Sequence, residues 1–209
     1  MIENVIKSIS FDQHEIIRNI LTLHCGGGNI DLDMTFSKGG FYKNGVVRPK
    51  LAVELDQELA KKHGVICADC TALPIESASQ RVVILDPPFG IGSGASLNRI
   101  VKGRNITPGR FSCFPNHDAL FGFVSKAIGE AYRVLAHKGI LILKIMPVVA
   151  CAKQHMTHIH AANVAREIGF YFLDEFVLMA KARPISGKIK RQQHARRFHS
   201  YFFVFRKDS

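Results

Sequence analysis

Several features that mark other protein classes are missing from this chain. It has no run of about 18 consecutive apolar residues, so no transmembrane helix is expected. The N-terminal stretch MIENVIKSISFDQHEIIRNI mixes charged with apolar positions and lacks the apolar core of a signal peptide. The five cysteines are odd in number and follow no regular framework, which is typical of a reducing compartment. The sequence therefore favours a cytoplasmic protein without a membrane partner.

Acidic residues are scarce relative to basic ones. Lys and Arg number 28 against 17 for Asp and Glu, which gives a formal net charge of +11. Such an excess on a small protein predicts a polyanionic partner, with nucleic acid ahead of a membrane surface. Hydrophobic residues make up 47% of the chain, which excludes a disordered tail. The length suits one domain over residues 1–209, and the oligomeric state is left open.

Short apolar segments of strand length alternate with helical patterns. Strands are expected at 29–33, 51–55, 65–68, 81–85, 140–145, 171–180 and 200–206, and helices at 14–24, 118–136 and 159–168. Nearly continuous apolar strands need cover on both faces, so the pattern indicates an α/β fold. We expect a Rossmann-like doubly wound sheet of about seven strands, mostly parallel with one antiparallel strand, and helices on both faces. Glycine, asparagine and proline within 37–50 make a regular first crossover helix unfavourable.

Acidic residues close three successive predicted strands. Asp69 follows Glu54 by 15 residues, and Asp86 follows Asp69 by 17. In open α/β sheets a ligand binds beyond the carboxyl ends of the strands, where a carboxylate can accept from ribose hydroxyls. Glu54 is the first candidate for that role and Asp56 the second, and Asp69 could accept from an adenine amine. The spacing predicts a site for a nucleoside cofactor.

The apolar strand 82–85 runs directly into the turn Asp86-Pro87-Pro88-Phe89. Both prolines have φ fixed and bias the preceding residue toward extended geometry, so the turn is stiff. The Asp86 carboxylate and the next carbonyl can both accept from one amino group, which would draw the nitrogen lone pair out of ring conjugation. Phe89 can stack on a flipped base. The turn thus suits presentation of an exocyclic amine for methylation; the alternative is an ordinary strand-ending turn.

Two connections carry an excess of basic side chains. The first, 90–116, is long for a compact domain, and such loops are usually functional or disordered. The second, 181–199, contains no acidic residue. The candidate nucleic-acid contacts are Arg99, Lys102, Arg104, Arg110, Lys188, Lys190, Arg191, Arg196 and Arg197. Two such loops favour a nucleic-acid groove over an ordinary solvated surface.

Taken together, these motifs resemble the class I S-adenosylmethionine-dependent amino-methyltransferases with a DPPY or DPPF motif, which act on nucleic-acid bases. The small bacterial and phage proteins of the DNA adenine-methyltransferase type are the most similar group. The similarity lies in DMTFSKGGFYKN (33–44), ADCTALP (68–74), ILDPPF (84–89), RFSCF (110–114), RVLAHKGILILK (133–144) and QQHARRFHSYFFVFRK (192–207). It extends over nearly the whole chain.

The resemblance implies S-adenosylmethionine as cofactor and adenine N6 of DNA as methyl acceptor, with the base flipped onto the turn. It places Asp33, Thr35, Phe36 and Gly39 at the methionine end of the cofactor, Glu54 at its ribose, Asp69 and Cys70 at its adenine, and Asp86, Pro87, Pro88 and Phe89 at the target amine. The first segment departs from the family pattern DxFxGxG. A residue intervenes before Phe36, and Ser37-Lys38 replaces the first glycine.

Other functions remain open at this point. Cytosine N4 and RNA adenine present the same exocyclic amine to the same turn. A protein-glutamine methyltransferase is disfavoured, because that activity is associated with Asn in place of Asp86 and would leave the basic loops unexplained. From a different class, a non-catalytic nucleic-acid-binding protein on a degenerate methyltransferase fold would account for the altered segment 33–40.

Metal binding is not expected. Cys67 and Cys70 form a C-x-x-C pair at a strand end, but zinc would need a second pair. Cys151, His155, His158 and His160 have the spacing of residues on one helical face, which could hold a metal. Methyl transfer requires no metal, so imidazoles near nucleic acid are the simpler interpretation.

Overall fold

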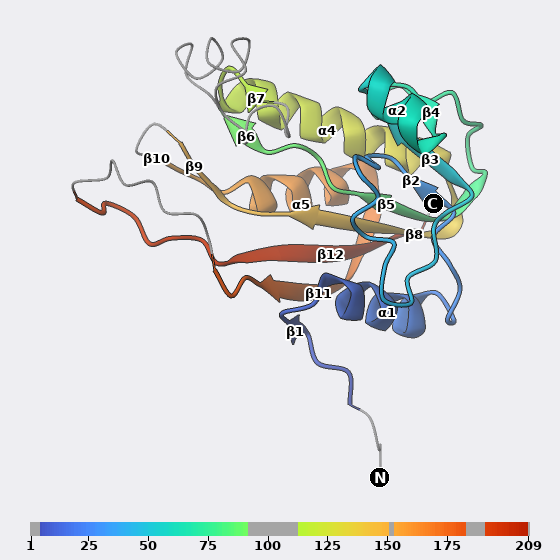
Figure 1. Cartoon of the computed structure of the whole chain (residues 1–209), viewed down its shortest axis with the longest axis horizontal. Helices are drawn as coiled ribbons and strands as arrows, with labels where there is room; N and C mark the ends of the chain where they lie inside the picture. The colour runs from blue at the N-terminus through green and yellow to red at the C-terminus, as the bar shows by residue number, and fades with distance from the viewer. Residues whose placement is uncertain (1–4, 92–112, 151–152, 183–190, 209) are drawn as a thin grey trace.

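The computed structural model describes residues 5–91, 113–150, 153–182 and 191–208. One eight-stranded sheet forms its centre (Figure 1). The strands are β1 (Ile9–Ser10), β2 (Leu32–Asp33), β3 (Leu51–Glu54), β4 (Ile66–Cys67), β5 (Gln80–Leu85), β8 (Leu135–Ile145), β11 (Phe170–Met179) and β12 (His199–Lys207). They lie in the order β1-β11-β12-β8-β5-β2-β3-β4. Only β12 is antiparallel to its neighbours among the pairs of this sheet.

The remaining described elements are helices and two small ladders. The helices are α1 (Gln13–His24), α2 (Gln57–His63), α4 (His117–Val134) and α5 (Thr157–Ile168). β6 (Gly90–Ile91) pairs in parallel with β7 (Cys113–Phe114), and β9 (Val148–Ala150) forms a hairpin with β10 (Lys153–His155). The predicted α/β sheet with one antiparallel strand is confirmed. It has eight strands because the short β1 adds to the edge strand β11.

Alternate residues of the central strands point into two separate cores. Val83 and Leu85 of β5 pack with buried side chains of α4 and α5. Val82 and Ile84 face the other way, into a cluster that contains the buried face of α1. Figure 1 shows α4 and α5 on one side of the sheet and α1 on the other. Strands buried on both faces explain the continuous apolar runs in the sequence.

Helix α1 packs on the face of the sheet that is not covered by a helix between β2 and β3. Asp12 caps the helix by accepting from the His14 backbone N–H at 2.9 Å. Residues 34–50 between β2 and β3 contain no helix, as the sequence predicted. Phe41 and Val46 of this segment instead pack against α1. The N-terminal helix therefore supplies cover that a crossover helix would otherwise provide.

The boundary between α4 and β8 differs from the sequence prediction. A helix to Ala136 was expected, whereas α4 ends at Val134 and β8 begins at Leu135. Leu135 pairs with Gln80 of β5, and the register then shifts before Val82. Strand pairing therefore overrides helix propensity here. Gly139 is needed because a Cβ would lie 2.8 Å from the Ala136 carbonyl oxygen.

No helix in the described part of the chain is long and apolar enough to cross a membrane.

Two substitutions on α1 test the core assignment. Ile20 is 0% exposed and Leu23 is 50% exposed, although both are aliphatic residues on one helix. We expect Ile20→Ala to lower the free energy of unfolding by about 2–5 kcal/mol, because it leaves a cavity. Leu23→Ala should change it by no more than about 0.5 kcal/mol. Urea titrations followed by circular dichroism measure both, and equal losses would contradict this packing.

Candidate active site at the carboxyl ends of the strands

The strand order of the sheet reverses beside β2. β3 and β4 lie to one side of β2, whereas β5 and β8 lie to the other. Asp33 ends β2, Glu54 ends β3 and Asp86 directly follows β5. Ligands of open α/β sheets bind at such a switch point, outside the carboxyl ends of the strands. The structure thus brings these three acids to one edge.

Asp33 is the most deeply buried acid at this edge, with 1% of its surface exposed. Its oxygens accept from the Tyr42 hydroxyl at 2.6 Å and from the Thr35 backbone N–H at 2.8 Å. Burial raises the pKa of Asp33 to about 7, and the charges of Asp86 and Glu54 add to the rise. The two hydrogen bonds act in the opposite direction. A cationic group placed beside Asp33 would therefore be stabilised by its ionised form.

Thr35 joins the ends of β2 and β5. Its hydroxyl oxygen accepts from the backbone N–H of Asp86 at 2.8 Å. The backbone of the Asp86 turn is therefore held directly to the segment after β2. The sequence placed Thr35 beside the cofactor. This hydrogen bond shows that Thr35 also holds the backbone of Asp86.

The ring of Phe36 is buried under the turn that follows it. It stacks on Tyr42 with centroids 5.6 Å apart, and the Arg48 guanidinium lies 4.9 Å from its centroid. Gly39 has a φ of +66°, and a Cβ there would lie 2.7 Å from the Phe36 ring. Glycine is required at this position because it allows both the turn and the packing.

Glu54 holds two backbone segments at the same edge. Its oxygens accept from the Ser37 N–H at 2.7 Å and the Asp56 N–H at 3.0 Å. Because each carboxylate oxygen has two lone pairs, Glu54 keeps acceptor capacity for a ligand. Asp56, the second candidate, caps α2 by accepting from the Leu59 N–H at 2.9 Å.

Asp69 and Cys70 lie just beyond β4. One oxygen of the exposed Asp69 accepts from both the backbone and the hydroxyl of Thr71 at 2.8 Å, and its other oxygen takes no bond within the described residues. Cys70 is buried, and its burial together with the Asp69 charge raises the pKa of the thiol to about 12. Cys70 is therefore a neutral packing group at neutral pH.

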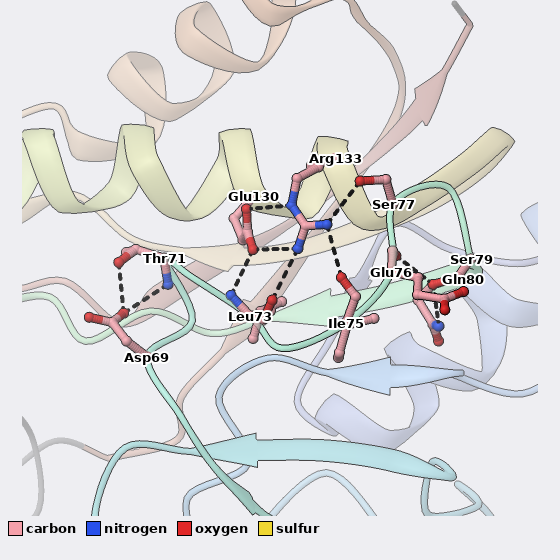
Figure 2. A network of polar contacts seen from close by, with 10 residues as sticks. All are labelled: Asp69, Thr71, Leu73, Ile75, Glu76, Ser77, Ser79, Gln80, Glu130 and Arg133. Atoms are coloured by element: carbon pink, nitrogen blue, oxygen red, sulfur yellow. Dashed lines mark hydrogen bonds and ion pairs between the residues drawn. The ribbon is translucent and has the colours of Figure 1, made fainter.

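Two charged residues of α4 form hydrogen bonds with residues 73–77, the segment that follows Asp69 and Cys70 (Figure 2). Glu130 accepts from the Leu73 N–H at 2.7 Å and pairs with Arg133 at 2.7 Å. The Arg133 guanidinium donates to the carbonyl oxygens of Leu73 and Ile75 and to the Ser77 hydroxyl. The network fixes the backbone immediately after Asp69. Sequence reasoning missed it, because no local pattern connects positions so far apart.

Lys144 is a site residue that sequence reasoning also missed. Its ammonium lies 3.0 Å from Asp86 Oδ2, and the two side chains are 17% and 25% exposed. It also lies 5.0 Å from the ring centroid of Phe41 and 5.9 Å from that of Phe202. Burial raises the pKa of Asp86, whereas the charge and hydrogen bond of Lys144 lower it. A single lysine closing the apolar run ILIL was the available signal.

The second oxygen of Asp86 has no partner among the residues that the structure describes. Oδ1 is buried and accepts no hydrogen bond within the described residues. A buried acceptor without a donor is costly, and a ligand N–H would satisfy it. Pro87 is buried and Phe89 is half-buried in the same turn. The geometry can therefore receive a donor group of a ligand next to an aromatic ring.

Most of the predicted basic contacts lie outside the described residues. Arg99, Lys102, Arg104, Arg110, Lys188 and Lys190 all belong to this group. Arg191 is exposed, whereas Arg196 and Arg197 are half-buried. Arg197 donates to Gln154 of β10, which ties its segment to the β9–β10 hairpin. In Figure 1 this hairpin lies at the same end of the sheet as β6 and β7.

The idea that four Cys and His side chains share a helical face is wrong. His155 ends β10, and α5 begins only at Thr157 with His158 and His160 in its first turns. Cys151 lies outside the described residues. A strand followed by a helix does not maintain helical spacing across the junction.

Comparisons with known proteins identify the fold. A SAM-dependent methyltransferase from Leishmania major aligns over 92% of this chain and 70% of that chain, at 13% identity and a TM-score of 0.55. A 1,6-didemethyltoxoflavin-N1-methyltransferase from Burkholderia thailandensis, solved with S-adenosylhomocysteine, aligns over 94% of this chain and 78% of that chain, at 16% identity and a TM-score of 0.51. This chain therefore has the fold of S-adenosylmethionine-dependent methyltransferases. No family model and no curated protein matches the sequence.

A DNA-directed structure is also among the matches. A putative DNA modification methylase from Thermus thermophilus, complexed with S-adenosyl-L-methionine, aligns over 65% of this chain at 16% identity and a TM-score of 0.44. The alignment spans about half of that protein, 51% of its length. At this TM-score the match gives no indication of the substrate of this chain.

The raised pKa of Asp33 predicts a pH-dependent contribution to stability. In the unfolded chain the carboxyl ionises at about pH 4, whereas the folded state keeps the proton until about pH 7. The free energy of unfolding should therefore fall as the pH rises between these values, by at most a few kcal/mol. Asp33→Asn cannot ionise and lacks this component. Urea unfolding at several pH values measures both proteins, and parallel pH curves would contradict the assignment.

Proposed function

We propose that this protein transfers a methyl group from S-adenosylmethionine to the exocyclic amine of a nucleic-acid base, with adenine N6 in DNA as the acceptor. One observation carries the proposal above all. Asp86 begins a proline-stiffened turn at the switch point and has one buried oxygen without a partner in the described part of the chain. The methyltransferase fold and the net charge of +11 support it.

The residues on the β2–β4 side fit a nucleoside cofactor with a positively charged methionine end. Asp33 can face the charge, because it is a buried carboxyl close to its ionisation point at neutral pH. Glu54 keeps acceptor capacity for ribose hydroxyls, and Asp69 has an oxygen available for an adenine amine. Thr35, Phe36, Gly39 and Cys70 then shape the walls of this part of the site. S-adenosylmethionine, when bound, supplies the electrophilic methyl group.

The residues on the β5 side fit an aromatic amine. Asp86 Oδ1 and the carbonyl of Pro87 would each accept one N–H of the amino group, which turns the nitrogen lone pair out of the base plane. Pro87 and Pro88 keep the turn rigid before the base arrives, and Phe89 offers a ring on which the base stacks. Catalysis is then mainly positioning, because a neutral amine needs no deprotonation before attack.

Lys144 has a supporting role in this arrangement. A carboxylate accepts hydrogen bonds from the amine best when it is ionised, and burial works against ionisation of Asp86. The ammonium of Lys144 offsets this effect of burial by pairing with Oδ2 of Asp86, and it leaves Oδ1 for the substrate. It is therefore a positioning residue that keeps Asp86 charged.

The net charge of +11 favours a nucleic acid as the methyl acceptor. Flipping a base out of a duplex costs about a few kcal/mol, and phosphate contacts can offset it. Arg191 and Arg196, with the basic residues outside the described part of the chain, would make such contacts. Cytosine N4 and RNA adenine fit the same turn. Incubation with labelled cofactor and mixed DNA and RNA, followed by nucleoside mass spectrometry, identifies the polymer, the base and the methylated position.

Replacing Asp86 tests the central contact. We expect Asp86→Ala to reduce turnover by at least about 100-fold, because the amine loses an acceptor that orients it. Asp86→Asn keeps an acceptor oxygen and should lose less. Cofactor affinity, measured by isothermal titration, should be retained in both variants. Near wild-type methylation by Asp86→Ala would refute the mechanism, and absence of cofactor binding by the wild type would favour a non-catalytic nucleic-acid-binding protein.

Replacing Lys144 tests the electrostatic support. Without its ammonium, burial acts unopposed on Asp86, so the pKa of that carboxyl rises. We expect the acid limb of the pH–rate profile of Lys144→Met to move to higher pH, with much of the activity recovered at alkaline pH. Lys126→Met, on the exposed face of α4, serves as the control and should keep the wild-type profile. A uniform loss at every pH would mean that Lys144 is only structural.

A further inference from the structure

Three neighbouring strands place large apolar side chains in solvent at the end of the sheet where Asp86 lies. Phe11 directly follows β1 and is 55% exposed, and Met179, the last residue of β11, is 37% exposed. Phe198 directly precedes the antiparallel β12 and is 39% exposed. The strands stand next to one another in the order β1-β11-β12. We call Phe11, Met179 and Phe198 the apolar cluster.

Backbone pairing keeps the members of the apolar cluster together. β1 and β11 pair in parallel up to Ser10 and Leu178, so the residues that follow these two leave the sheet side by side. The Ala180 N–H donates to the Phe198 carbonyl oxygen at 2.7 Å, which ties the start of β12 to the end of β11. Single exposed apolar residues are normal on a protein surface, whereas a contiguous group indicates an interaction site.

Basic side chains surround the apolar cluster. The Lys181 ammonium lies 5.8 Å from the ring centroid of Phe11, and this lysine is exposed. Arg191, Arg196 and Arg197 belong to the segment that leads into β12. None of these four cations forms an ion pair with a carboxylate in the described part of the chain. At the opposite end of the sheet, by contrast, a single aspartate pairs with both a lysine and an arginine.

Two acidic residues stand near Phe11, but both are engaged at the start of α1. Asp12 accepts from the His14 backbone N–H at 2.9 Å, and Glu15 accepts from the Ser10 hydroxyl at 2.6 Å. The four cations around the cluster outnumber these two carboxylates. A ligand that complements this surface therefore carries negative charge as well as flat apolar groups.

The apolar cluster is within reach of the Asp86 turn. β12 stands two strands from β5 in the sheet order, and β1 stands four strands from it. At about 4.8 Å between neighbouring strands, the cluster begins roughly 10 Å from β5 and ends roughly 19 Å from it, measured across the sheet. In Figure 1 the end of β11 and the start of β12 face the same side of the molecule as the β9–β10 hairpin. One extended ligand can therefore contact both places.

Single-stranded nucleic acid has the chemistry that this surface lacks. Proteins that bind single strands combine cations, which contact phosphates, with aromatic rings on which exposed bases stack. The bases of a duplex are stacked on each other, so their faces are not available to Phe11 and Phe198. A purely apolar partner would leave the four cations without counter-charges, and a purely anionic one would leave the rings in water.

We propose that the apolar cluster and its surrounding cations bind single-stranded DNA, and that the protein acts on an unpaired base. The inference rests on the proposed function, because the bound strand is the one that would deliver its base to the Asp86 turn. Phe11 and Phe198 stack on bases, and Lys181 with the three arginines contacts phosphates. An unpaired base also avoids the cost of flipping out of a duplex, which is about a few kcal/mol.

Fluorescence anisotropy with a short labelled oligodeoxynucleotide tests the preference for a single strand. We expect the full chain to bind the single strand at least about tenfold more tightly than the duplex of the same sequence. Equal or tighter binding of the duplex would overturn the inference. Tighter binding of an RNA strand of the same sequence would overturn the choice of DNA.

Variants of the rings test whether stacking carries the affinity. Phe11→Ala and Phe198→Ala should each weaken binding of the single strand by about 5- to 100-fold, the range for losing one stacked base. Tyr171→Ala is the matched control, because Tyr171 is 54% exposed and has Arg206 5.2 Å from its ring centroid, but begins β11 at the opposite end of the sheet. Losses no larger than that of the control would refute the site.

Conservative changes at Phe11 guard against a variant that folds poorly. Phe11→Tyr keeps an aromatic ring and should retain the wild-type affinity, whereas Phe11→Leu keeps only the apolar bulk and should lose it. Equal affinity of these two variants would exclude stacking. A wild-type dimer that Phe11→Ala converts to monomers, seen by sedimentation velocity, would also overturn the inference, because a second copy of the chain would then cover the cluster.

The salt dependence of binding tests the phosphate contacts. Lys181→Gln should reduce the slope of log affinity against log salt concentration by about 0.7, the value for one phosphate contact on a single strand. Lys126→Gln, on the exposed face of α4, should leave the slope unchanged. An unchanged slope in Lys181→Gln would remove that lysine from the site.

Anisotropy needs no turnover, so the outcomes for binding and for catalysis are separate. Methylation of DNA without a preference for the single strand would refute this inference and leave the proposed function in place. Binding of the single strand with the expected losses, but without methylation, would support the site and refute the proposed function.

Discussion

Burial of the Asp86 carboxylate is the constraint on which the arrangement of the residues at the carboxyl ends of the strands depends. A charged carboxylate taken out of water needs a compensating partner, and the chain supplies an ammonium group. Lys144 pairs with Oδ2, and Thr35 fixes the backbone of the residue. The remaining oxygen is left for a ligand. A partly buried ion pair contributes little net stability. The main effect of Lys144 is therefore to keep the Asp86 carboxylate ionised and in one orientation.

The parallel sheet explains why several acids gather at this edge. Parallel strands end on the same side, so residues that close β2, β3 and β5 become neighbours although they are far apart in sequence. Asp33 retains its proton to about pH 7 mainly because it is buried, and repulsion from the charges of Asp86 and Glu54 adds to the rise of its pKa. A cationic ligand would relieve that repulsion, which links the electrostatics of the fold to the proposed cofactor.

The segments after β5 and β8 form the other half of the edge. They carry the β6–β7 ladder and the β9–β10 hairpin. Arg197 attaches the segment before β12 to this hairpin through Gln154. The side that would receive the base is thus built from short pieces whose mutual position depends on side-chain contacts rather than on the central sheet.

Local sequence was sufficient for the architecture and for the position of Asp33, Glu54 and Asp86 at the ends of strands. Apolar runs of strand length, alternating with amphipathic helices, determined an α/β sheet, and the chemistry of Asp86-Pro87-Pro88-Phe89 determined a rigid turn at its edge, because both depend on neighbours in the chain. Tertiary structure alone decided which distant groups meet: Lys144 with Asp86, and Arg133 with the segment after Asp69. It also decided that Leu135 begins a strand, since pairing with Gln80 outweighs helix propensity. Each of these contacts closes a long loop, and no pattern confined to a few residues records the position to which such a loop returns.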